Sequence, residues 1–172
     1  KKLQDAQAAI GNTVTIFMII SVLLTVMLLI FINPIVAVMD TPEEAVKGIT
    51  DYLIVCFIGI PFVTAYNVIS SIFRGLGDSK SPMYFIAVAC GLNIALDYIF
   101  IGVCGMGPLG AALGTTLAQT FSVIISFAAI KRMNTGLKLT RNDFVPRKNV
   151  LGEIVKIGLP VAVQDGCIQI AF

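Results

Sequence analysis

Residues 6–39 read AQAAIGNTVTIFMIISVLLTVMLLIFINPIVAVM, a stretch of 34 residues without a charged side chain. A helix that crosses the hydrocarbon core of a bilayer needs about 20 apolar residues. Core helices of soluble proteins are usually shorter, and they carry polar residues on the face that meets water. The stretch therefore predicts a helix that spans a membrane.

The rest of the chain repeats this pattern, with short charged loops between long uncharged segments. The predicted complete spans are Ile10–Ile32, Tyr52–Phe73, Pro82–Val103 and Leu109–Ile130. A fifth span begins near Val150, and Pro61 favours a kink in the middle of the second. Only 13% of the residues are charged, about half the usual share of a soluble domain. The pattern predicts an all-α, polytopic membrane helix bundle, with the lipid bilayer as its solvent.

Composition also excludes several classes of function. A net charge of +2 offers no basic surface for nucleic acid. Histidine is absent, and the four cysteines form no CxxC pair, so neither a zinc site nor a histidine base is expected. No GxSxG motif and no phosphate-binding GxxxxGK[ST] motif occurs. We therefore expect no enzyme and no cofactor.

The basic residues are distributed unevenly between the two sides of the predicted spans. Eleven of the 12 Lys and Arg residues precede the first span, separate the second from the third, or follow the fourth. Only Lys47 lies on the opposite side. Because positively charged loops stay in the cytoplasm, this asymmetry predicts the topology of a multi-pass protein of the cell membrane.

The ends of the chain suggest a larger protein. The sequence starts with Lys1 rather than Met, and it stops at Phe172 inside an apolar run. We expect the remaining helices of a longer protein to be partners of this segment.

Asp97 is the most informative residue inside the predicted spans. A carboxylate in hydrocarbon is costly, so it is expected to face protein or water and to serve function. Asn93 lies one helical turn earlier on the same face. Asp97 and Thr115 each lie nine residues from Met106, the centre of the intervening turn, so an antiparallel pair of helices would bring them to similar depth. The spacing predicts a polar cluster of Asp97, Asn93 and Thr115, with Asp97 as a candidate proton or cation site.

Two further regions carry weaker signals. Gly110, Gly114 and Ala118 form a stripe of small residues that favours close helix packing. In the fifth span, Gln164 and Asp165 follow Pro160 and are candidates to line a cavity.

Four short motifs resemble the multidrug and toxic compound extrusion (MATE) family of transporters. They occur in the order expected for that family and extend over essentially the whole chain. The motifs are RGLGDSKSPM at 74–83, NIALDYIFI at 93–101, GPLGAALGTTLAQ at 107–119 and KIGLP at 156–160.

The resemblance implies a twelve-helix, two-lobe antiporter that exports small organic, often cationic, compounds in exchange for H⁺ or Na⁺. Residues 1–130 would be helices three to six of an incomplete first lobe. Residues 131–149 would be the cytoplasmic linker between the lobes, and residues 150–172 the truncated start of helix seven.

The resemblance also implies a site. In some members an Asn and an Asp on helix five and a Thr on helix six form a cation site, and these positions match Asn93, Asp97 and Thr115. A further acid on helix one would lie outside this chain, so Na⁺ at Asp97 and a proton both remain open. The alternative is a lipid-linked sugar or polysaccharide flippase of related helix plan, which usually has a more cationic cavity.

Overall fold

The computed structural model describes residues 2–39 and 42–132, together with positions 145, 152, 156, 158, 160, 163, 164 and 167. The chain divides into two compact units, one of Phe17–Asn134 and one of Lys1–Ile16 with Thr135–Phe172. The predicted linker, residues 131–149, lies outside the described residues except for positions 131, 132 and 145.

Helix α1 (Lys2–Ile30) contains most of the long uncharged stretch, and the short helix α2 (Ile32–Val38) contains most of the remainder. The break at Phe31 has a local cause in Pro34, which has no N–H to give to the carbonyl of Ile30 and whose ring crowds that carbonyl. The uncharged stretch is therefore two helices rather than one, and the first span ends at Ile30.

Three long helices form the rest of the larger unit: α3 (Glu43–Gly75), α4 (Lys80–Asp97) and α5 (Gly107–Arg132). A π-helical segment, η1 (Tyr98–Val103), continues α4. Four helices in the described residues have the length and composition to cross a membrane, which confirms the four predicted spans. The second span begins earlier than predicted, at Glu43, because α3 continues from its acidic first turn into the apolar segment without a break.

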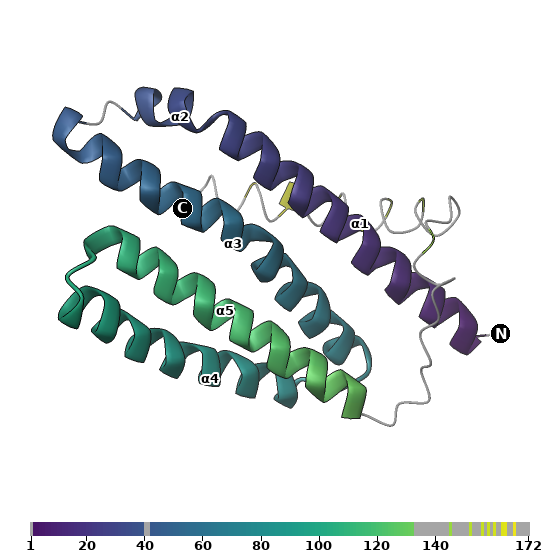
Figure 1. The fold of residues 1–172 in the computed structure, drawn as a ribbon. Helices are drawn as coiled ribbons and strands as arrows, with labels where there is room; N and C mark the ends of the chain where they lie inside the picture. The colour runs from purple at the N-terminus through teal and green to yellow at the C-terminus, as the bar shows by residue number, and fades with distance from the viewer. Residues whose placement is uncertain are drawn as a thin grey trace. The chain divides into compact units, whose positions relative to one another are not determined.

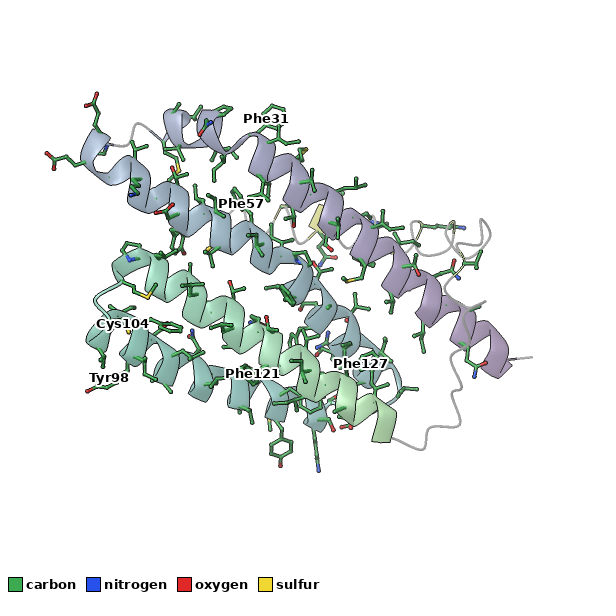
Figure 2. The ribbon with its side chains drawn as sticks, viewed as in Figure 1. Phe31, Phe57, Tyr98, Cys104, Phe121 and Phe127 are labelled. Carbon is green, nitrogen blue, oxygen red and sulfur yellow. The ribbon has the colours of Figure 1, made fainter. Side chains whose placement is uncertain are left out.

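Helix α4 runs antiparallel to α3 and α5, which run in the same direction, and α5 packs against both α3 and α4 (Figure 1). The main hydrophobic cluster lies near the turn between α3 and α4. It consists of Tyr66, Ile69, Phe73 and Phe85. The rings of Phe73 and Phe85 meet edge to face, 5.5 Å apart. Larger apolar side chains such as Tyr98 and Phe127 lie on the outside of the helices (Figure 2), as expected where lipid replaces water.

The turn between α3 and α4 is held by Asp78. Gly77 adopts a φ of 85° there, a conformation that disfavours residues with a Cβ. The Asp78 carboxylate accepts hydrogen bonds from the backbone N–H groups of Lys80 and Ser81 and from the Ser81 hydroxyl. These bonds, chiefly the one from the Ser81 hydroxyl, hold the pKa of Asp78 below its ordinary value. The charged carboxylate thus caps the first turn of α4.

Candidate cation site

Asp97 is the last residue of α4, and the wider π-helical turn begins immediately after it. In η1 the N–H of Cys104 bonds to the carbonyl of Ile99, five residues back, at 2.9 Å. Single π-helical turns inside α-helices occur frequently at functional sites. No pattern of residue types in 98–103 indicates a π-helix, so this segment could not be predicted from the sequence.

The structure brings Asn93, Asp97 and Thr115 to one place between α4 and α5. The Asn93 side-chain amide donates a hydrogen bond to the Thr115 hydroxyl at 3.3 Å. Asp97 lies one turn further along α4 and faces Gly114, the residue before Thr115. The depth estimate had aligned Asp97 with Thr115, whereas the structure aligns it with Gly114. A π-helical segment accommodates more residues per turn than an α-helix, and we attribute the difference of one residue to η1.

The Asp97 carboxylate is half-buried and incompletely bonded. Its Oδ1 atom is buried without a hydrogen-bond partner, the only such side-chain atom in the part of the chain that the structure describes. No basic residue occurs in the sequence between Ser81 and Ile130 to neutralise the charge. An unpaired carboxylate oxygen beside an amide and a hydroxyl offers oxygen donors that suit a hard cation or a site for an exchangeable proton.

Two hollows lie beside α5, and both are lined by Thr115 and Gln119. The first, of about 200 Å³, lies among α3, α4 and α5 and includes Asn93, Cys90 and Tyr66 in its lining. The second, of about 290 Å³, lies between α3 and α5. Its lining is Tyr52, Cys56, Gly59, Ile60, Val63, Thr64, Ala112, Thr115, Thr116 and Gln119. No described lining residue of either hollow is charged. Gln119 is a polar residue of this region that the site prediction missed, although it lies one turn after Thr115 on the same face.

Pro61 affects the neighbouring helix contacts. α3 remains helical through Pro61, but Pro61 cannot donate to the carbonyl of Phe57. The Thr25 hydroxyl donates to that carbonyl instead, at 3.1 Å. Two residues before Phe57, the carbonyl of Val55 accepts a hydrogen bond from the Thr116 hydroxyl at 3.4 Å, and this hydroxyl lies against Gly59. Hydroxyls from other helices therefore support the α3 backbone around the proline.

The two residues predicted to line a cavity in the fifth span lie apart from this cluster in the sequence. Gln164 is helical and exposed, whereas Asp165 lies outside the described residues. Their role remains a prediction.

Comparison with known proteins identifies the family. The MatE family model matches residues 1–99. The probable multidrug resistance protein YpnP of Bacillus subtilis is 39% identical over 127 residues, which are 73% of this chain and 28% of YpnP. Two solved structures of a multidrug resistance MATE family transporter of the MOP superfamily are also similar. The inward-facing one has a TM-score of 0.77 at 26% identity, covering 92% of this chain and 42% of the other. The outward-facing one has a TM-score of 0.78 at 27% identity, covering 98% and 43%.

The chain belongs to the MATE family of multidrug efflux transporters, which are multi-pass proteins of the cell membrane and not enzymes. Members of this family use ion coupling and need no cofactor. The chain spans 28% of the length of YpnP and less than half of the solved transporters.

Proposed function

We propose that this chain is part of a secondary active antiporter that exports organic, often cationic, compounds in exchange for H⁺ or Na⁺. In this proposal, residues 1–130 are helices three to six of the first lobe, residues 131–149 the linker, and residues 150–172 the start of helix seven. Asp97, Asn93 and Thr115 bind the coupling cation, and Gln164 and Asp165 line the cavity.

The observation that carries this proposal is the buried Oδ1 atom of Asp97, which has no hydrogen-bond partner. A buried polar atom without a partner is costly, and such atoms in a native protein need an explanation. A proton or a sodium ion that binds Asp97 neutralises its charge and satisfies this atom. The adjacent Asn93–Thr115 hydrogen bond keeps two further oxygen-bearing side chains beside the carboxylate.

Exchange of an organic compound for a cation also requires that the full transporter open alternately to the two sides of the membrane. This segment has closely similar TM-scores to an inward-facing and an outward-facing transporter, 0.77 and 0.78. That similarity supports a mechanism in which helices α3, α4 and α5, together called the α3–α5 unit, keep their fold while access to the site changes. A cation that binds one access state more tightly than the other then shifts the equilibrium between them.

The alternative, a flippase for lipid-linked sugars, requires recognition of a phosphate-bearing lipid. Basic side chains are suited to bind phosphate, and the described linings of the two hollows contain none. Their uncharged hydroxyl, amide and apolar surface suits an organic compound without a phosphate group better than a phosphate-bearing lipid.

The test uses the full-length protein with Asp97→Asn, which keeps the shape of the side chain but removes its charge. We expect export of a fluorescent organic cation to fall to background in proteoliposomes under imposed H⁺ or Na⁺ gradients, with normal membrane insertion. Glu44→Gln is the matched control, because Glu44 is an exposed carboxylate in the first turn of α3. Wild-type export by Asp97→Asn, with unchanged pH and sodium dependence, would contradict the proposal. Transport of a lipid-linked sugar instead of the cation would favour the flippase.

A further inference from the structure

Gly114 presents bare backbone to the Asp97 carboxylate. Gly114 is buried in α5, and a Cβ built on it would overlap Oδ1 of Asp97. The same Cβ would lie 3.4 Å from Cγ of Asp97 and 3.5 Å from its backbone nitrogen. The carboxylate therefore occupies the space that any side chain at position 114 would fill.

The distances show which part of the structure would yield to a larger residue. A separation of 3.4–3.5 Å is ordinary van der Waals contact, so the α4 backbone tolerates a methyl group at this position. Only the carboxylate oxygen is too close, and it can move by rotation of the Asp97 side chain. Gly114→Ala is therefore expected to displace the carboxylate while the two helices keep their separation.

The other glycines of α4 and α5 face different surroundings. A Cβ on Gly110, one turn before Gly114, would meet Cβ of Phe100 at 3.0 Å and Cβ of Met106 at 3.1 Å. Gly110 thus permits apolar packing and does not contact the carboxylate. A Cβ on Gly91 of α4 would meet nothing within 4 Å. The chain therefore offers the same substitution in three distinct environments.

We propose that Gly114 is a positioning residue for the cation site. Because Gly114 has no side chain, the Asp97 carboxylate can lie against the α5 backbone. This inference rests on the proposed role of Asp97 in coupling. In this position Oδ1 is buried without a hydrogen-bond partner and remains available to the coupling cation. A methyl group at position 114 turns the carboxylate away from this position and changes its affinity for the cation.

The experiment compares Gly114→Ala, Gly110→Ala and Gly91→Ala in the full-length transporter. Drug export is measured against pH and against Na⁺ concentration in proteoliposomes, and thermal stability is measured in detergent. For Gly114→Ala we expect the cation concentration at half-maximal export to change by about tenfold, the usual scale for residues that orient a cation ligand. Its thermal stability should match that of Gly91→Ala. Gly110→Ala should lower thermal stability without changing the cation dependence, and Gly91→Ala should change neither.

A second variant approaches the same contact from the other side. Asp97→Glu lengthens the acid by one methylene group, so its carboxylate no longer fits against Gly114. We expect a change in cation dependence similar to that of Gly114→Ala, and the double variant should show less than the product of the two effects, because both disturb one contact. If Gly114→Ala does not fold, Asp97→Glu alone decides, and wild-type cation dependence in that variant overturns the inference.

The outcomes separate this inference from the function on which it rests. If Asp97→Asn abolishes export while Gly114→Ala keeps the wild-type cation dependence, Gly114 is a packing residue and the coupling proposal stands. If Asp97→Asn exports with wild-type cation dependence, the coupling proposal fails and the inference fails with it. Pure loss of stability in Gly114→Ala, without a change in cation dependence, also overturns the inference.

Discussion

The α3–α5 unit has two halves that differ in whether their buried polar groups have hydrogen-bond partners. In the half near the α3–α4 turn, Phe73 is 1% exposed and Ser126 is fully buried, and the hydroxyl of Ser126 donates to the carbonyl of Ser122 at 2.7 Å. Near the far end of α4, Asp97 is half-buried and one of its oxygens has no partner.

This difference distinguishes two kinds of polar side chain in a membrane protein: those that only stabilise the fold and those that serve function. A hydroxyl that bonds to a carbonyl of its own helix is satisfied within the helix and adds little to function. A carboxylate is far more costly in hydrocarbon, and its presence is usually explained by function. The half near the turn thus provides stability, and the half around Asp97 provides the proposed site.

The largest expected effect is on the well-packed half. Phe73→Ala removes a ring that is almost completely buried and in contact with Phe85. We expect the free energy of unfolding to fall by about 3–5 kcal/mol because a cavity remains. Chemical denaturation of the purified transporter in detergent measures this loss. Phe121→Ala is the control, since Phe121 is 50% exposed. Equal losses for the two variants would show that the burial of Phe73 does not stabilise this half.

A smaller effect is expected at the site itself. Asn93→Ala removes the donor of the hydrogen bond to Thr115 but leaves the Asp97 charge in place. We expect a loss of about threefold to tenfold in coupled export, the kinetic equivalent of one hydrogen bond. Efflux assays at several Na⁺ concentrations and pH values measure the loss. Thr115→Ala should give a loss of similar size. An effect of either variant as severe as that of Asp97→Asn would contradict the prediction that Asp97 contributes most to coupled export.

Tyr66→Phe tests the hydrogen bonding of the well-packed half. The Tyr66 hydroxyl donates to the carbonyl of Pro82 at 3.0 Å and joins α3 to the start of α4. Its loss should lower the free energy of unfolding by about 0.6 kcal/mol, the average for hydrogen bonds between membrane helices. The ring remains, so packing is conserved. A loss as large as that of Phe73→Ala would indicate that the hydroxyl, rather than the ring, stabilises this region.

The smallest effect is expected in the α3–α4 turn, at acidic pH. The pKa of Asp78 is lowered mainly by the Ser81 hydroxyl, so the turn is stabilised by the charged carboxylate. This stabilisation is present above the ordinary pKa of Asp, about 3.9, and is lost as the pH falls through the lowered pKa. Ser81→Ala should raise the pKa of Asp78 toward its ordinary value. NMR titration of the Asp78 carboxyl carbon measures this shift, and an unchanged pKa would contradict the assigned cause.

Much of the fold could be predicted because membrane insertion depends on local composition. The uncharged segments around Val22, Gly59, Ala89 and Ala118 each became a helix of the expected kind. The break at Phe31 could also have been predicted from Pro34, whose missing N–H is a property of the sequence. The polar cluster was predicted from helix periodicity, which places Asn93 and Asp97 on one face.

The details of the site could not be predicted in this way. The stripe of small residues predicts a packing role for Gly114, because such stripes usually have that role. Its contact with Asp97 depends on how closely α4 and α5 approach and on their relative rotation. Likewise, the Phe57 carbonyl accepts a hydrogen bond from Thr25, which lies 32 residues away in the sequence. This contact forms only when the helices pack.

The sequence alone therefore determined the class of this protein, its four complete spans and the acid on which the proposed exchange depends. The free energy of transferring each side chain into lipid is a property of that side chain and its neighbours along the chain. The tertiary structure decided the one-residue offset that places Asp97 opposite Gly114, and it left Oδ1 of Asp97 buried without a partner. These features arise between helices, where contacts depend on atoms that are far apart in the sequence.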